Sequence, residues 1–456
     1  MKIKKAIASA LLALGLISAA SIASADSTVV IGIHTYNVVY ITGSTAARGN
    51  IFDAVTAGSG GVFDSAPTFQ TQSGSAPTTS TGNYNEYGTI GGAYYLLSFD
   101  FTGSEAGIYA LEHQSLGEPN PYNNTLYNGT NAAGVLPGTP NPTGFVNPAN
   151  PSGALLTEAA DLSMADTGQA VSLSAPPAYA ALHDYGVVGC VTFEWVKGPN
   201  SAADQSWIDM TNVTDWQMNY ALGSPQVACY LTGNTNDQDD VYMIGRNIGS
   251  GTHVNTMLVT QHGVRGTVDQ YAPANCGYTN GTLSIGNTSV TLASAGGLVN
   301  IGNDGFDSGS GVAGTLSMDE HGATDQYGQI VCIGYAGISD ANSAITHGAA
   351  KMSDDGVLES DATVINGTYP FWGHEHLYGT PTENADVVTV AQALAGTTGN
   401  DTIGTGSGAS GAIERQGQLG GDESISLWPT TQSTVIDPKV MLCNKPSDSG
   451  YPAIFE

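Results

Sequence analysis

The chain has 456 residues, with 11 Lys+Arg against 40 Asp+Glu, which gives a formal net charge of −29 at pH 7. A protein that holds nucleic acid by neutralising its phosphates needs a basic face, so this charge balance excludes that class. Hydrophobic residues make up 41% of the chain, enough for a large core in more than one lobe in spite of 60 Gly and 20 Pro.

The first 25 residues have the pattern of a secretory signal peptide. Lys2, Lys4 and Lys5 precede an apolar stretch, and residues 23–25 have the small-x-small spacing of a cleavage site. After residue 25, no uncharged apolar run reaches the ~18–20 residues of a membrane span. We therefore expect a soluble mature chain from about Asp26 that is periplasmic or secreted, with no membrane insertion after signal removal.

The five cysteines are spaced too widely for a CxxC metal or redox motif. In an oxidising compartment one or two disulfides are expected, with at least one thiol left over, and the sequence leaves the pairing open. The cysteines are Cys190, Cys229, Cys276, Cys332 and Cys443.

A strand, a Gly-containing turn and a helix follow one another three times along the chain. The expected elements are 29–33, 38–41 and 45–57, then 94–101 and 105–114, then 241–244 and 253–261. Each junction carries a hydroxyl residue at or near a helix N-cap, where free amides and the positive end of the helix dipole favour an anion. A Ser or Thr that only caps a helix explains any one junction, but three together favour a shared anion site.

Segments rich in Gly, Asn, Pro, Ser and Thr separate these units and read as insertions without a fixed repeat. They are 58–89, 115–153, 273–315 and 395–422. Two acidic runs, 237–240 and 304–307, lack the full ligand alternation of a calcium loop, so we expect both to be solvated surface loops.

The third junction reads Arg246-Asn247-Ile248-Gly249-Ser250-Gly251-Thr252. Its R-x-x-x-S-G-T pattern resembles the anion clamp of the periplasmic phosphate-binding subunits of phosphate ABC transporters, in the type II periplasmic binding protein superfamily. Further landmarks of that family follow in the family's order, at 40–46, 101–108, 161–166, 333–335 and 368–371. The resemblance covers about residues 38–397, and the insertions carry no match.

The resemblance implies an α/β fold of two α/β lobes with a hinged interlobe cleft. It places lobe one at 26–185 and 345–456 and lobe two at 186–344, after a signal peptide at 1–25. It implies an extracytoplasmic solute-binding protein that captures inorganic phosphate or a related oxyanion and delivers it to an ABC transporter permease. We expect a monomer with no cofactor.

The resemblance also implies the ligand-binding residues, which share an ability to donate hydrogen bonds to an oxyanion, Asp166 excepted. They are Thr45, Ala46, Ser104, Asp166, Arg246, Ser250, Gly251 and Thr252. Arg246 offers a planar fork that can hold two oxygens at once. Asp166 can only accept, so it suits a ligand that brings a proton, as hydrogen phosphate does and sulfate does not. The unpaired, repelled carboxylate would disfavour sulfate by at least ~1–3 kcal/mol.

Two residues depart from the family pattern. Ala46 replaces a bulkier residue, and Glu105 sets a second carboxylate beside Ser104. We expect Glu105 to point to solvent. If Glu105 faced the cleft instead, a ligand other than phosphate would become an alternative.

Two other classes of function compete with the binding protein. An enzyme needs a nucleophile or a metal, but no G-x-S-x-G is present, and His374 and His376 have no evident third ligand. We therefore expect no catalysis and no metal site, with this histidine pair as polar surface. The alternative is a secreted cell-surface or matrix adhesive protein built on a binding-protein scaffold, which the polar insertions favour.

Overall fold

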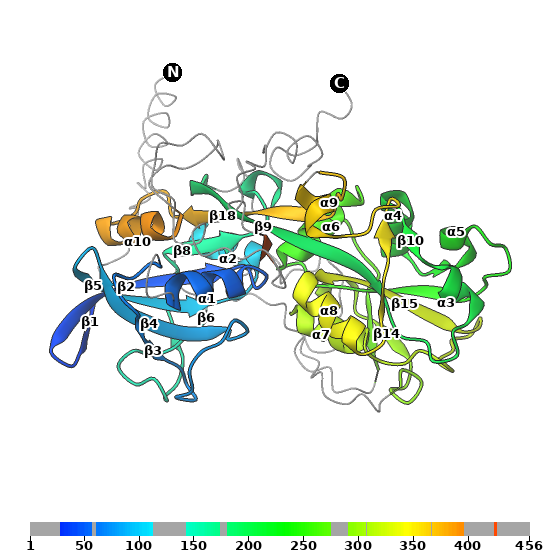
Figure 1. Ribbon diagram of the computed structural model, residues 1–456, viewed down its shortest axis with the longest axis horizontal. Coiled ribbons are helices and arrows are strands. Elements are labelled where there is room, and N and C mark those ends of the chain that lie inside the picture. The colour runs from blue at the N-terminus through cyan, green and yellow to red at the C-terminus, as the bar shows by residue number, and fades with distance from the viewer. Residues whose placement is uncertain are drawn as a thin grey trace, which may run out of the picture.

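The computed structural model describes residues 28–56, 61–112, 143–173, 180–274, 291–306, 308–365, 367–395 and 424–425. Strands and helices build two α/β lobes, which lie side by side in Figure 1. The first lobe holds strands β1–β5 and β8 with helices α1, α2 and α10. The second holds β11, β12 and β15 with α3–α9. The predicted α/β class with two α/β lobes is confirmed.

One sheet path runs through both lobes in the order β11-β12-β15-β9-β18-β8-β2-β5-β4-β3. From the second lobe to the first, these strands are β11 (Gln226–Val227), β12 (Asp240–Ile244), β15 (Ile330–Gly337), β9 (His183–Lys197), β18 (Trp372–Gly379), β8 (Leu162–Ala165), β2 (His34–Gly43), β5 (Ala93–Asp100), β4 (Asn83–Ile90) and β3 (Thr68–Gln70). β2 runs parallel to β5 and β8, and β12 runs parallel to β15. Because strand ends of parallel neighbours share one edge, the loops that follow these strands gather there.

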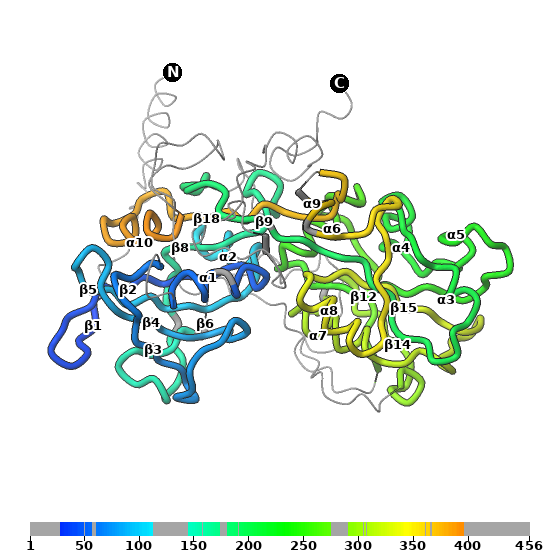
Figure 2. The backbone as a smooth tube through the Cα atoms, viewed as in Figure 1, coloured from blue at the N-terminus to red at the C-terminus, as the bar shows by residue number. Residues whose placement is uncertain are grey.

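Strands β9 and β18 connect the lobes. The first part of β9 pairs with β18, and its last residues pair with β15, both antiparallel. In Figure 2 the orange segment of the chain returns from the second lobe to the first along β18. These two crossings place the interlobe boundary beside the loops that end β2, β8 and β12.

The remaining strands lie at edges or in short pairs. β1 (Thr28–Ile31) pairs with β2, while β16 (Ala350–Lys351) and β19 (Ser424–Ile425) pair with β9. The separate pairs are β6 (Thr143–Phe145) with β7 (Leu156–Thr157), β10 (Asn212–Val213) with β17 (Ser353–Asp354), and β13 (Tyr271–Pro273) with β14 (Leu298–Asn300).

Ten α-helices and two short 3-10 turns are present in the described residues. The helices are α1 (Arg48–Thr56), α2 (Ser104–Glu112), α3 (Gln205–Asp209), α4 (Asp215–Gly223), α5 (Cys229–Thr232), α6 (Gly251–Val259), α7 (Gly309–Thr315), α8 (Ile338–Thr346), α9 (Asp361–Ile365) and α10 (Ala385–Ala395). The 3-10 turns cover Gln169–Val171 and Gly302–Asp304. All three predicted strand–turn–helix units are therefore confirmed.

Each lobe has its own apolar core. Val39, Ile41 and Phe99 lie in the first-lobe core, and Trp195 and Ile333 lie in the second. All eight residues of β15 are buried. This is expected for a central strand whose two faces are both covered, and it explains the near-continuous apolar run in its sequence. Among the helices that the structure describes, none combines the length and the hydropathy that a bilayer crossing requires.

The division of the chain at residue 345 stays a prediction. Met352, Val364 and Phe371 belong to the second-lobe core, although they follow that residue. This packing favours a return to the first lobe at β18 rather than at residue 345.

The expectation that the acidic run at 237–240 forms a solvated surface loop is wrong. Asp237 is buried and accepts a hydrogen bond from Thr232 Oγ1 at 2.6 Å, and Asp240 begins the buried strand β12. Part of the run at 304–307 lies outside the described residues. Cys229 and Cys332 carry free thiols, while Cys276 and Cys443 lie outside the described residues.

Candidate anion-binding site

The loops after β2, β5 and β8 are joined at one edge of the sheet by backbone hydrogen bonds. Gly103 N donates to Gly43 O at 2.8 Å, and Ser44 N donates to Met164 O at 2.8 Å. Ser44 Oγ then accepts from Ala47 N at 3.2 Å, which explains why α1 begins after residue 47 rather than at the predicted residue 45. The segments at 40–46, 101–108 and 161–166, which resemble the family's landmarks, are thus neighbours in space.

The start of α2 contacts the second lobe through the residues before α6. Ala106 N donates to Gly249 O at 3.3 Å. Gly103 has a φ of +114°, and a Cβ placed on it would lie 2.6 Å from Gly249 O. Only glycine fits both the left-handed backbone and the close approach, so the residue type at 103 permits the two lobes to meet here.

Three predicted ligand residues, Ser104, Asp166 and Gly251, meet at this contact. Asp166 N donates to Ser104 Oγ at 3.2 Å. A Cβ placed on Gly251 would lie 1.4 Å from Asp166 Oδ1 and 2.7 Å from Ser104 Oγ. The Asp166 carboxylate therefore lies against the first turn of α6, with a first-lobe hydroxyl beside it.

Asn255, one turn further along α6, holds this arrangement in place. Its Nδ2 donates to Asp166 O at 2.8 Å and to Gly251 O at 3.1 Å. The sequence analysis did not identify Asn255. Its spacing of four residues from Gly251 puts it on the same face of the helix, which is the signal that points to it.

Arg246 follows β12 and is 4% exposed, so it is no surface residue. Its Nε donates to Phe306 O at 3.1 Å, and its own carbonyl oxygen is hydrogen-bonded by His253 Nδ1 at 3.0 Å and by Gln270 Nε2 at 3.2 Å. Burial lowers the pKa of His253 to about 4, so this imidazole is neutral at pH 7. A guanidinium stays protonated in proteins, so Arg246 brings a fixed positive charge into the interior.

The turn between Arg246 and α6 is compact. Ser250 N donates to Asn247 O at 3.1 Å, and Gly249 N donates to Asn247 Oδ1 at 2.9 Å. Ser250 is the N-cap of α6, yet its side chain makes no capping hydrogen bond. Ser250 and Thr252 are both 2% exposed, so their hydroxyls lie inside the protein beside the helix N-terminus.

Thr45 and Ala46 occupy the turn before α1. Ala46 is 7% exposed and belongs to the same apolar cluster as the second-lobe core, whereas Thr45 is half-buried. Among the described contacts, none joins Thr45 to Ser104, Asp166 or Gly251. The structure therefore brings Ser104, Asp166 and Gly251 into direct contact. Arg246, Ser250 and Thr252 are close to Gly251 in the chain. In the described part of the chain, Thr45 contacts none of the three.

The expectation that Glu105 points to solvent is wrong. Its side chain is fully buried and accepts hydrogen bonds from Thr167 Oγ1 at 3.1 Å and from Leu173 N at 2.9 Å. Burial raises the pKa of Glu105 to about 7 against the opposing effect of these donors. Glu105 thus anchors the segment that follows Asp166, which is why α2 is buried over residues 104–111.

The expectation that His374 and His376 form a polar surface is also wrong. They lie on β18, which is paired with β8 on one edge and β9 on the other, and are 2% and 7% exposed. Glu375 between them is buried too, and its pKa is raised well above the usual value by burial and then by the charge of Asp166. Glu375 is therefore close enough to Asp166 for the two charges to interact, and the sequence analysis did not identify it.

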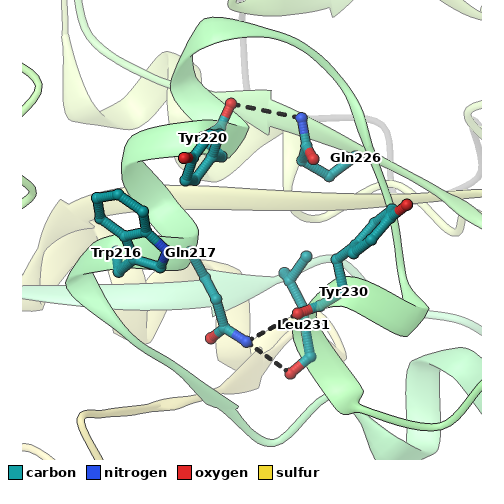
Figure 3. A pocket seen from close by; sticks show the side chains of 6 residues that line it. All are labelled: Trp216, Gln217, Tyr220, Gln226, Tyr230 and Leu231. Atoms are coloured by element: carbon teal, nitrogen blue, oxygen red, sulfur yellow. Dashed lines mark hydrogen bonds between the residues drawn. The ribbon is translucent and has the colours of Figure 1, made fainter.

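A surface pocket of about 410 Å³ lies apart from these residues, on α4 and α5 (Figure 3). It is lined by Trp216, Gln217, Tyr220, Gln226, Tyr230 and Leu231. Its walls are aromatic and amide groups, and no predicted anion ligand takes part in them. The pocket is consequently a poor candidate for an anion.

No family model and no curated protein matches the chain. Several solved structures are similar to it. A putative phosphate ABC transporter substrate-binding protein from Clostridium perfringens, solved with bound phosphate, is 12% identical with a TM-score of 0.36, covering 78% of this chain and 91% of that one. A phosphate binding protein from Stenotrophomonas maltophilia is 13% identical with a TM-score of 0.37, covering 91% and 96%. An ABC-type phosphate transport receptor from Vibrio cholerae is 12% identical with a TM-score of 0.35, covering 77% and 93%.

These names describe the compared proteins.

Proposed function

We propose that this protein captures inorganic phosphate, or a closely related oxyanion, outside the cytoplasm for uptake by an ABC transporter. The observation that carries the proposal is the meeting of Ser104, Asp166 and Gly251, which are brought together from two lobes. This contact sets a hydroxyl, a carboxylate and a helix N-terminus against one another at a lobe boundary, where an anion held between two lobes would need its partners.

The donors suit a tetrahedral oxyanion. Arg246 supplies a charged fork, Ser104, Ser250 and Thr252 supply hydroxyls, and the first turn of α6 supplies amides that have no partner within the helix. Thr45 and the amide of Ala46 would complete the set from the first lobe. Because Arg246 and both α6 hydroxyl residues are at most 4% exposed, little water competes for the ligand.

Asp166 gives the site its selectivity. Its carboxylate lies at the start of α6, where an anion would bind, so a ligand without a proton would be repelled there. A protonated phosphate oxygen can donate to this carboxylate, whereas sulfate cannot. The expected discrimination against sulfate is about 1–3 kcal/mol.

The two lobes explain how the ligand would be held. A phosphate that bonds to Ser104 in the first lobe and to Arg246 in the second favours the conformation in which the lobes meet, and hinge closure follows from that differential binding. We infer a monomer that delivers its ligand to a permease, with no catalytic step at the site.

The test is calorimetry on the full mature chain, refolded from denaturant to strip carried-over ligand. We expect one phosphate per chain and sulfate binding weaker by about 5- to 150-fold, the factor that corresponds to 1–3 kcal/mol. A sugar phosphate serves as the bulky control, and exclusion of it would indicate an enclosed site. Binding of neither phosphate nor sulfate by the refolded wild type would overturn the proposal.

A further inference from the structure

Three aspartates in the second lobe lie together, apart from the anion site. The carboxylate oxygens that Asp215, Asp354 and Asp355 can offer as ligands all lie within 4.8 Å of one another. Asp215 begins α4 directly after β10, and Asp354 ends β17, which pairs with β10. Asp355 N donates to Val213 O at 2.9 Å, which fixes the turn after β17 against the start of α4.

Asp354 is fully buried, and neither of its carboxylate oxygens has a hydrogen-bond partner among the described residues. Asp215 Oδ1 is buried without a partner as well. Burial raises the pKa of Asp354 to about 7, and the nearby indole of Trp195 opposes this, although its N–H does not reach hydrogen-bonding geometry. Leaving a buried carboxylate unpaired is costly, so the fold needs something to compensate it.

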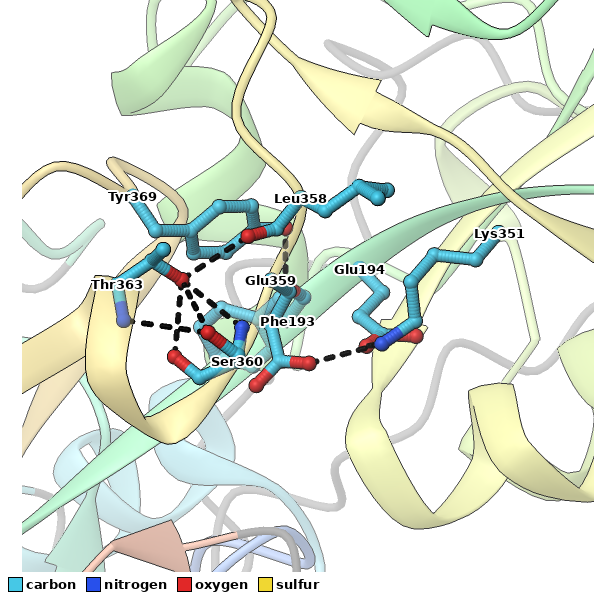
Figure 4. Close-up of polar contacts among 8 residues, drawn as sticks. All are labelled: Phe193, Glu194, Lys351, Leu358, Glu359, Ser360, Thr363 and Tyr369. Atoms are coloured by element: carbon cyan, nitrogen blue, oxygen red, sulfur yellow. Dashed lines mark hydrogen bonds and ion pairs between the residues drawn. The ribbon is translucent and has the colours of Figure 1, made fainter.

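Other carboxylates nearby are compensated by a lysine. Lys351 forms ion pairs with Glu194 and Glu359, the latter at 2.8 Å (Figure 4). In the part of the chain that the structure describes, no ion pair reaches any of the three aspartates. Tyr369, buried among these acids, donates its hydroxyl to Phe193 O at 2.7 Å instead. The described residues thus supply no protein cation to the three aspartates, and burial raises the pKa of Asp215 to about 8.

A shared proton does not explain this geometry. Two carboxyls that share a proton are joined by a short O–H···O hydrogen bond, whereas Asp215, Asp354 and Asp355 act on one another only through their charges. The spacing suits a metal instead. Calcium lies about 2.3–2.6 Å from each oxygen ligand, so ligand oxygens across one ion are separated by up to roughly 5 Å.

We propose that Asp215, Asp354 and Asp355 bind one divalent cation of the size of calcium. Hard cations of this kind prefer carboxylate oxygens and accept six to eight oxygen ligands, so water would complete the shell. The ion would fasten the start of α4 to the turn after β17. It would thereby tie together the outgoing and returning parts of the second lobe.

The test uses the full mature chain after treatment with a calcium chelator, in buffer free of phosphate. The probes are calorimetry with calcium chloride and luminescence of terbium(III), which occupies calcium sites and is excited through nearby Trp195. We expect one site per chain, terbium emission that calcium displaces, and a melting temperature several degrees higher with calcium than with chelator.

Two variants and one control make the assignment specific. Asp355→Asn should weaken calcium binding at least about tenfold, because the ligand charge falls. Asn tolerates the φ of 49° at residue 355, so folding should be preserved. Asp354→Asn should abolish the response of the melting temperature to calcium while raising that temperature in chelator.

The control is Asp269→Asn, a half-buried aspartate of the same lobe whose carboxylate already accepts from Asn300 at 2.9 Å. It should bind calcium as the wild type does. Absence of calcium and terbium binding in the wild type, or unchanged binding in Asp355→Asn, would overturn the cation site. Neither result touches the phosphate proposal, which is measured separately with phosphate alone.

Discussion

Replacing Gly251 by alanine tests the interlobe contact directly. A Cβ at this position would lie 1.4 Å from Asp166 Oδ1, 2.5 Å from Asp166 Cγ and 2.7 Å from Ser104 Oγ. An ordinary Cβ contact begins at 3.4 Å, so the carboxylate or the whole lobe must move by roughly 2 Å. Asp166 cannot shift freely, because its backbone is hydrogen-bonded to Ser104 and to Asn255.

The expected cost follows from overpacking of this kind, which is about 1–3 kcal/mol. If the contact forms only in the closed, ligand-bound state, the whole cost appears as lost affinity, and the dissociation constant for phosphate rises about 5- to 150-fold. Stability without ligand should not fall, since Ala favours a helix over Gly by about 0.5–1 kcal/mol. Loss of affinity with unchanged or raised ligand-free stability is the signature of a closure contact.

The assay is a phosphate titration together with a melting curve of the ligand-free protein. Gly328→Ala is the matched control, because a Cβ there meets no atom within 4 Å and its backbone is ordinary. It should bind phosphate as the wild type does. If Gly251→Ala bound phosphate with wild-type affinity, the contact between Gly251 and Asp166 would have no part in closure, and the site as described would be refuted.

Further predictions concern charge. Arg246→Lys keeps the charge but loses the paired fork, so calorimetry should show phosphate affinity reduced about 10- to 150-fold, or 1.5–3 kcal/mol; unchanged affinity would make Arg246 structural. Asp166→Asn should narrow the selectivity for phosphate over sulfate by about 1–3 kcal/mol in paired titrations, and equal selectivity would end its role as proton acceptor. Burial raises the pKa of Glu86 from 4.5 to about 8, so the folded state holds this proton more tightly. Its contribution to stability is present below pH 4.5 and is lost as pH rises to 8, by at most about 5 kcal/mol. Between pH 5 and 8.5 the melting temperature of Glu86→Gln should fall less steeply with pH than that of the wild type. The same dependence of melting temperature on pH in both proteins would contradict this.

The strand–turn–helix units could be predicted because their signals are local. In β12 and β15 the apolar runs are short and bounded by turn residues, which is enough to place a buried strand. The strand β4 was missed inside the predicted insertion at 58–89. It contains Asn85 and Glu86, which are 0% and 1% exposed, and these polar residues conceal a buried strand from any pattern of hydropathy.

The site could be predicted only as far as the motif extends along the chain. Arg246 to Thr252 is a contiguous segment, so its loop and helix start were foreseeable. The environments of Glu105 and Glu375 depend on segments distant in sequence, such as Leu173 for Glu105 and β8 and β9 for Glu375. A charged residue type indicates exposure on average, and it misleads where a neighbouring segment covers it.

The burial of these carboxyls bears on how a protein with a formal net charge of −29 could hold an anion. Exposed charges beyond about 10 Å are largely screened at physiological salt, so the groups beside the ligand decide the outcome. Burial raises the pKa of Glu105 to about 7, so it carries a proton for about half of the time at neutral pH, and burial also raises the pKa of Glu375 well above its usual range. The site then presents less negative charge than its residue types suggest, while Arg246 stays charged throughout. An acidic surface and an anion site are therefore compatible in one chain. Burial favours the neutral form of the carboxyls near the proposed site, while the guanidinium of Arg246 keeps its positive charge.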